Sequence, residues 1–421
     1  MLKLLMGLLI LFVLTGCDKD HTIAGNATVF YADAPVDITI ENNFKTSGAN
    51  ILTDRSDKND TDSFDTGTSL ETKDKNDTGN DDDNSSLTDV SRDIAIEANL
   101  SREPYYHQQW YLENNETFYS DNSIEPNASI HAGETLKRYT GRGVTIAIID
   151  DGVDATHEEL NGSIVAMYDI ETNTTNVSHI RPGSYHGTAV TGIIAANLNG
   201  KGIVGIARES DIIFLKYKEG MSDSETIELF NQAEALGADI INCSWGTYDV
   251  SPAVKETIQK LAQDGRDGKG IIIVFAVGNN DRDMGNDESA IPEVIAVGST
   301  DRDNLRAWYS NYGEHLDILA PGGYDVGITT LDPMGSSGIG YMAENYLLAT
   351  DPYSFIGSSA SAPIVTGTIA LLLEKDPELT RVEIEELLNN RSDKVGTIDY
   401  SAGHNIYYGY GKVNAGRLLK E

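Results

Sequence analysis

Four short segments of the chain carry side chains that could act together as acid, base, oxyanion donor and nucleophile. Asp150 lies in the segment IIDDG, His186 in SYHGTAVTG and Asn279 in AVGNN, while GSSASAP offers several serines before an apolar helical pattern. A carboxylate can hold an imidazole in one tautomer, and the neutral imidazole can then take a hydroxyl proton near neutral pH. An asparagine amide can donate to a developing oxyanion. Each feature alone also fits a strand-end or helix-capping role, but together and in this order they favour catalysis by a serine nucleophile.

The elements that position these side chains are predicted by continuous apolar runs of strand length, at residues 143–150, 211–217, 238–245, 270–278 and 294–299. Such runs are typical of strands buried on both faces of a parallel sheet. Helical patterns alternate with them, so the sequence predicts a doubly wound α/β domain over residues 101–421. We expect a mostly parallel sheet with helices on both faces. Active sites in such folds lie beyond the carboxyl ends of the strands, where Asp150 and Asn279 fall.

The four segments resemble the signature segments of the subtilisin-like serine proteases, the subtilases, and the resemblance covers most of residues 103–421. It implies that Asp150 orients the base His186 and that Ser359 is the nucleophile. It also implies that Asn279 and the backbone N–H of Ser359 form the oxyanion hole. The implied reaction is hydrolysis of peptide bonds through an acyl-enzyme.

A subgroup is suggested by the segments EPYYHQQWYLEN, CSWGTYD and WYSN, which resemble those of the kexin and furin proprotein convertases. This resemblance implies that Asp249 faces the side chain before the scissile bond and that Asp151 faces the preceding one, both favouring basic residues. A carboxylate in a pocket is matched by an arriving cation. The alternative for Asp249 is a loop-capping or calcium-ligating role. Gly183 and Asn311 stand where convertases carry acidic residues.

Further substrate-binding residues are expected in the same CSWGTYD segment, at Ser244, Trp245 and Gly246. Cys243, in the same segment, is predicted to be a small buried hydrophobe rather than a nucleophile.

Structural calcium is implied by the segment AANLNGKGIVGIA, which matches the length of the family's calcium loop. By that match the ligands are the side chain of Asn199, the carboxylates of Glu103 and Glu159, and the backbone carbonyls of Asn197, Lys201 and Ile203. Oxygen ligands of mixed kind suit calcium. A plain surface turn is the alternative. A second calcium site is a weaker expectation, around Asp249, Asp283 or Asp287, and Asn311.

The N-terminus reads as a targeting segment followed by a tether. Residues 1–16 are predicted to be a signal peptide, because Lys3 is followed by an apolar run that is too short to span a bilayer comfortably. LTGC resembles a bacterial lipobox, which implies lipidation of Cys17 and attachment to a membrane of the bacterial cell envelope. An ordinary signal peptide is the alternative. Residues 17–100 are predicted to be a lipidated start and an acidic disordered linker.

The net charge of −35 argues against nucleic-acid binding. The expected partners are a protein or peptide substrate, a membrane through the anchor at Cys17, and a separate folding helper, because no compact prodomain is evident. Two alternatives to a selective processing protease stay open: a broad-specificity degradative subtilisin, and a catalytically inert calcium-binding surface lipoprotein. Cleavage after basic or apolar residues, or no cleavage, distinguishes the three.

Overall fold

The computed structural model describes residues 93–181, 183–339 and 345–420. The predicted signal peptide, Cys17 and almost all of the predicted linker lie outside these residues. Within the described part of the chain, no helix combines the length and the apolar character needed to cross a membrane.

A seven-stranded sheet, with neighbouring strands parallel throughout, forms the centre of the protein, in the order β2-β3-β1-β4-β5-β6-β7. Its strands are β1 (Thr145–Asp150), β2 (Ile164–Asp169), β3 (Asp211–Lys216), β4 (Ile240–Cys243), β5 (Ile272–Ala276), β6 (Ile295–Thr300) and β7 (Ile318–Pro321). The predicted α/β class with a mostly parallel sheet is therefore confirmed. The five apolar runs correspond to β1, β3, β4, β5 and β6, whereas β2 and β7 were not predicted.

The central strands are apolar on both sides because helices cover both faces of the sheet. Alternate residues of β1 belong to two separate cores: Ile146 and Ile148 pack on one face, Ala147 and Ile149 on the other. Burial of all four is complete. This explains why the strands read as continuous apolar runs rather than as alternating ones.

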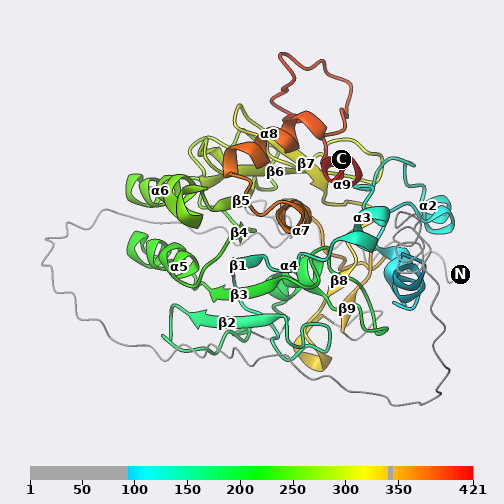
Figure 1. Ribbon diagram of the computed structural model, residues 1–421, viewed down its shortest axis with the longest axis horizontal. Coiled ribbons are helices and arrows are strands. Elements are labelled where there is room, and N and C mark those ends of the chain that lie inside the picture. The colour runs from blue at the N-terminus through cyan, green and yellow to red at the C-terminus, as the bar shows by residue number, and fades with distance from the viewer. Residues whose placement is uncertain (1–92, 182, 340–344, 421) are drawn as a thin grey trace, which may run out of the picture.

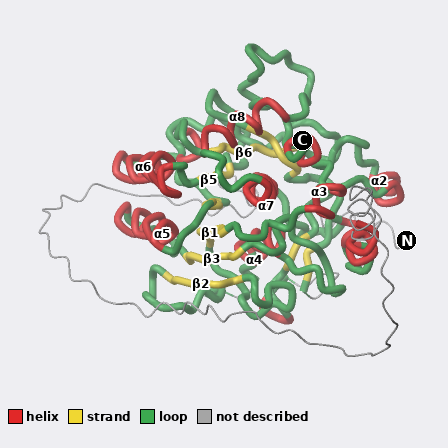
Figure 2. The backbone as a smooth tube through the Cα atoms, viewed as in Figure 1, coloured by secondary structure: helices red, strands yellow, loops and turns green. Residues whose placement is uncertain are grey.

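The helices lie in two layers (Figure 1). One core includes α4 (His186–Ala195) and α7 (Ser358–Lys375), and the opposite core includes α5 (Asp223–Ala235) and α6 (Pro252–Gly268). Figure 2 shows the two layers on either side of the strands, with loops surrounding them. The start of α5 carries a capping box between Ser222 and Glu225, which satisfies two backbone N–H groups.

The remaining elements are short or peripheral. Residues 93–100 are helical, and the sheet domain is completed by α2 (Glu116–Asn122), α3 (Gly133–Arg138), α8 (Arg381–Arg391) and α9 (Ala415–Leu418). A two-stranded antiparallel sheet pairs β8 (Thr330–Leu331) with β9 (Tyr346–Leu347), and three 3-10 turns cover Tyr106–Gln108, Glu288–Ala290 and Gly335–Ser337. Cys243 is free and buried, and burial raises the pKa of its thiol well above the usual value. The prediction of a small buried hydrophobe is confirmed.

Candidate active site

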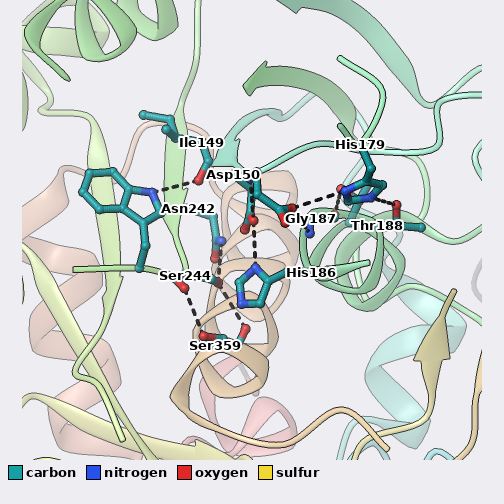
Figure 3. Close-up of polar contacts among 12 residues, drawn as sticks. Ile149, Asp150, His179, His186, Gly187, Thr188, Asn242, Ser244 and Ser359 are labelled. Atoms are coloured by element: carbon teal, nitrogen blue, oxygen red, sulfur yellow. Dashed lines mark hydrogen bonds and ion pairs between the residues drawn. The ribbon is translucent and has the colours of Figure 1, made fainter. Parts of the chain in front are cut away.

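The acid of the site is Asp150, the last residue of β1. Its carboxylate is fully buried, and Oδ1 accepts hydrogen bonds from Nδ1 of His186 at 2.7 Å and from the backbone N–H of Asp151 at 2.8 Å (Figure 3). The other oxygen, Oδ2, has no hydrogen-bond partner among the described residues. Asp150 is thus placed to hold the tautomer of His186 that keeps its proton on Nδ1.

The base is His186, the first residue of α4. Burial lowers the pKa of its imidazole, but the charge and hydrogen bond of Asp150 and the charge of Asp151 raise it by more, to about 9. The ring packs edge-on against Phe355, with 5.5 Å between the ring centroids. The carboxylate on one side and the aromatic ring on the other fix the orientation of a strong base.

The nucleophile predicted from the sequence, Ser359, is the second residue of α7 and lines the same cleft as His186. Its hydroxyl donates to the carbonyl oxygen of Ser244 at 3.0 Å, and the hydroxyl of Ser244 donates back to the carbonyl oxygen of Ser359 at 3.1 Å. Figure 3 shows this reciprocal pair beside the imidazole. The hydrogen bond from a nucleophilic serine to its histidine base often forms fully only when substrate is bound.

Pro363 explains how Ser359 and Ser244 come to be joined. A proline inside a helix has no N–H for the carbonyl four residues earlier, which in α7 is the carbonyl of Ser359. The hydroxyl of Ser244 takes the place of the missing donor. Asn242 in turn donates to this hydroxyl at 3.1 Å and accepts from Thr366 at 2.9 Å. A buried polar chain therefore ties β4 to the start of α7.

The oxyanion donor predicted from the sequence is Asn279, three residues beyond the end of β5. Its Oδ1 accepts from the backbone N–H of Ser358 at 2.8 Å and from the hydroxyl of Ser358 at 3.0 Å. Because the oxygen is occupied, Nδ2 is the group of this side chain that remains as a donor. His186, Asn279 and Ser359 therefore line one cleft, and the buried carboxylate of Asp150 is bonded to His186.

The cleft has a volume of about 440 Å³. Of the predicted substrate-binding residues, Asp151, Ser244, Trp245 and Gly246 line it. Asp249 does not: it is exposed, and its carboxylate accepts from the side chain of Asn286 at 2.8 Å. The lining also includes residues that the sequence analysis did not assign to substrate, namely Glu171, Arg181, Lys218, Glu219, Tyr248 and Asp287.

Asp287 is the buried carboxylate that reaches this cleft. Its side chain is 2% exposed and accepts hydrogen bonds from the backbone N–H of Tyr248 and from Ser289, and burial raises its pKa. A Cβ atom on Gly246 would lie 2.6 Å from Oδ2 of Asp287, so only glycine allows this close approach. Among the described residues, no cationic side chain pairs with Asp287 within 4.0 Å.

A second histidine, His179, stands behind Asp151. Its Nε2 lies 2.8 Å from the hydroxyl of Thr188 (Figure 3). Its Nδ1 lies 3.5 Å from Oδ1 of Asp151 and has no hydrogen-bond partner among the described residues, while that oxygen accepts from the N–H of Gly187. Burial lowers the pKa of His179 to about 4, whereas burial and the charge of Asp150 raise the pKa of Asp151 to about 6. Sequence reasoning missed His179, because a lone histidine in a polar loop matches no motif.

The predicted calcium loop and both predicted carboxylates come together in the structure. Glu103 accepts from the backbone N–H groups of Gly200 at 2.5 Å and Gly202 at 2.9 Å. Glu159 is fully buried; Oε1 accepts from Tyr346 at 2.8 Å, while Oε2 has no hydrogen-bond partner among the described residues. Burial, with the nearby charge of Glu103, raises the pKa of Glu159 to about 7.

Such an unsatisfied buried oxygen is costly unless a cation compensates it. The backbone N–H of Asn197 donates to the carbonyl of Glu159 at 2.8 Å, and Oδ1 of Asn199 accepts from the N–H of Lys201 at 3.0 Å. Ile203 lies in the same loop, with its side chain fully buried. The unpartnered Oε2 of Glu159, with the carboxylate of Glu103 on the same loop, is the feature that fits a calcium ion, whereas Oδ1 of Asn199 is occupied by the N–H of Lys201.

Comparisons with known proteins agree with this geometry. The family model described as "Subtilase family" matches residues 141–411. A "Calcium-dependent protease" from Nostoc sp. is 33% identical over 344 residues, covering 74% of this chain and 50% of that protein. "Subtilisin" from Bacillus pumilus is 30% identical over 285 residues, covering 66% of this chain and 90% of that protein. The chain spans about half the length of the two calcium-dependent proteases that it matches.

The fold also occurs in solved structures. The Aeromonas sobria serine protease, solved in complex with a chaperone, gives a TM-score of 0.65 at 18% identity, covering 76% of this chain and 66% of that one. At this identity the likeness concerns the fold. The match over residues 141–411 and the arrangement of Asp150, His186, Asn279 and Ser359 together assign the chain to the subtilase family.

Proposed function

We propose that the protein is a serine endopeptidase that hydrolyses peptide bonds through an acyl-enzyme. The observation that carries the proposal is the 2.7 Å bond between Asp150 and His186 at a cleft that Ser359 and Asn279 also line. An inert surface lipoprotein is disfavoured, because all four residues are present and gathered. Hydrolysis of a panel of chromogenic peptides, together with labelling by a serine-directed fluorophosphonate, tests the proposal; an enzyme with neither property would contradict it.

The chemistry follows from the roles that these side chains can take. The hydroxyl of Ser359 leaves the carbonyl of Ser244, attacks the scissile carbonyl carbon and gives its proton to Nε2 of His186. The buried carboxylate of Asp150 stabilises the imidazolium that forms. Nδ2 of Asn279 and the backbone N–H of Ser359 donate to the oxyanion. The imidazolium then protonates the leaving amine, and water releases the acyl group by the reverse sequence of proton transfers.

Preference for a basic residue before the scissile bond is part of the same proposal, and Asp287 supports it. A buried carboxylate with no cation of its own favours an arriving lysine or arginine. Asp151 lines the cleft beside the base and supports a second basic residue upstream. The proposed assignment to the kexin-like subgroup rests on these two carboxylates. A degradative protease of broad specificity is the alternative.

The two candidate carboxylates for this preference can be told apart by matched variants. We expect Asp287→Asn to lower kcat/KM for peptides ending in lysine or arginine by about 10- to 100-fold, the effect of losing a hydrogen bond to a charged group. Peptides ending in leucine should change little. The ratio of kcat/KM for the two peptide classes is the measurement. If Asp249→Asn removes the preference instead, the assignment from the sequence is the correct one and Asp287 is structural.

Calcium bound at Glu103, Glu159 and the loop at residues 197–203 is proposed to have a structural role. Calcium at about 100 times its dissociation constant should add about 2.7 kcal/mol to the free energy of unfolding, or about 4 °C in Tm. We expect Glu159→Gln to remove this response, and to leave the calcium-free protein at least as stable as wild type, because a buried unpaired charge is lost. Differential scanning calorimetry with and without chelator measures both effects.

Glu158→Gln is the control for this experiment, since Glu158 pairs with Lys201 at the surface, at 2.8 Å, and is not a proposed ligand. It should keep the calcium response. Equal Tm values for the wild-type protein with calcium and with chelator would contradict the calcium proposal.

Export to the bacterial cell envelope and a lipid anchor at Cys17 remain proposals from the sequence, since that residue lies outside the described part of the chain. A separate folding helper is likewise proposed. The Aeromonas sobria protease was solved with a chaperone, which gives the idea a precedent in the fold.

A further inference from the structure

The buried residue Asn311 contacts the loop that carries Asn279 at several points. Its side-chain Nδ2 donates to the carbonyl of Val277 at 2.7 Å, and its Oδ1 accepts from the backbone N–H groups of Asn280 at 3.0 Å and Arg282 at 3.2 Å. These contacts lie on both sides of Asn279 in the chain. Asn311 itself is 0% exposed.

The backbone of Asn311 adds a fourth contact, because its N–H donates to the carbonyl of Gly278 at 3.0 Å. Gly278 has φ of +93°, and a Cβ atom at this position would lie 2.7 Å from Nδ2 of Asn311. Glycine therefore permits both the backbone conformation and the close approach of the amide. Asn311 offers a donor and an acceptor at the same reach, whereas aspartate lacks the donor and leucine lacks both.

The side chain of Asn279 is fixed from the opposite direction. The hydroxyl of Ser358 accepts from the N–H of Gly278 at 3.0 Å and donates to Oδ1 of Asn279 at 3.0 Å. Asn311 thus sets the path of the backbone, while Ser358 sets the rotation of the amide. This positioning of Asn279 does not require Asn311 or Ser358 to bind the ground-state substrate.

We infer that Asn311 is a positioning residue of the oxyanion hole, which acts on the transition state through Asn279. The inference rests on the proposed peptidase function. Asn311 is also one of the residues predicted for a second calcium site. Its Oδ1 already accepts two hydrogen bonds and its Nδ2 is a donor, so no side-chain oxygen is left over for a cation.

A double-mutant cycle tests this inference. Asn279→Ala alone should lower kcat by about 10²- to 10³-fold, as for loss of one oxyanion donor. Asn311→Ala alone should lower kcat by about 10- to 100-fold with KM changed less than about twofold, since a displacement near 1 Å can cost that much. In the Asn279→Ala background, Asn311→Ala should cost less than about threefold, because the group it positions is gone.

The outcomes separate the two levels of the argument. If wild-type protein hydrolyses no peptide, the proposed function fails. If wild type is active and Asn279→Ala behaves as expected, an Asn311→Ala loss that is equal in both backgrounds assigns Asn311 a merely structural role. An unchanged kcat would also overturn the inference.

Two further variants guard against misfolding. Asn311→Asp keeps the size of the side chain but replaces the donor to Val277 with an acceptor that is charged when ionised, so it should show the same background-dependent loss of kcat without a cavity. Asn405→Ala is the matched control. The side chain of Asn405 also joins two points of a loop, because it donates to the carbonyl of Asp399 and accepts from the N–H of Tyr407, but it does not line the cleft. It should lower Tm and leave kcat unchanged.

Discussion

Replacing Ser359 with alanine should lower kcat for peptide hydrolysis by about 10⁶-fold, the size expected when a triad loses its nucleophile. The variant should keep the wild-type Tm to within a few degrees, because the side chain of Ser359 makes only one hydrogen bond, to the carbonyl of Ser244. Steady-state kinetics with a chromogenic peptide, run at high enzyme concentration, measures the residual rate. Labelling with a fluorophosphonate should be lost in parallel.

Ser361→Ala provides the control from the same segment. Its hydroxyl donates to the carbonyl of Ala320 at 3.0 Å and lies 3.0 Å from the hydroxyl of Ser299, both on the side of the sheet. This variant should retain labelling and most of the activity. If Ser359→Ala were still labelled and Ser361→Ala were not, the nucleophile would be misassigned.

Asp150→Asn should lower kcat by about 10⁴-fold, which leaves a residual rate well above that of Ser359→Ala. An amide in place of the carboxylate can hold the wrong tautomer of His186, and it cannot stabilise the imidazolium. The mutation therefore removes both the orientation and the charge that the 2.7 Å bond provides.

The same variant should move the acid limb of the pH profile. In the wild-type protein the pKa of His186 is raised to about 9, so kcat/KM should rise with pH until the imidazole has lost its proton near that value. Without Asp150, burial dominates and lowers the pKa of His186. The limb should then shift to lower pH in Asp150→Asn, and an unshifted limb would mean that another group titrates.

The fold class was predictable because the central strands are covered on both faces, which leaves an unbroken apolar signature in β1, β4 and β5. The strands that escaped prediction lie at the two edges of the sheet. β2 is partly exposed at Ile164, Val165 and Met167, and β7 is buried but has only four residues and ends in Pro321. A partly exposed strand and a very short one each leave only a weak apolar run in the sequence.

The site was predictable where a residue type and its chemistry occur in one short segment, as for His186 and Ser359. It was not predictable where the partner is far away in sequence. Asp287 reaches the cleft through a turn that the sequence does not fix, while Asp249, the expected carboxylate, faces solvent. Asn311 contacts the backbone of Val277, 34 positions away, and His179 lies 3.5 Å from the side chain of Asp151, 28 positions away. No single motif contains both members of such a pair.

The register of the central strands has a consequence for how this protein can change. Ile149 pairs with Cys243, and Cys243 pairs with Phe275. The segments bearing Asp150, Ser244 and Asn279 therefore follow neighbouring strands of one hydrogen-bonded ladder. The hydrogen-bonded backbones of the strands set the spacing of the reacting groups. Substitution of side chains elsewhere in the strands therefore need not change this spacing. The rim of the cleft, at residues 180–181, 183–185 and 217–219 and at Asp287, belongs to segments outside that ladder. Substitutions in the rim can therefore change substrate selectivity while the catalytic residues keep their positions.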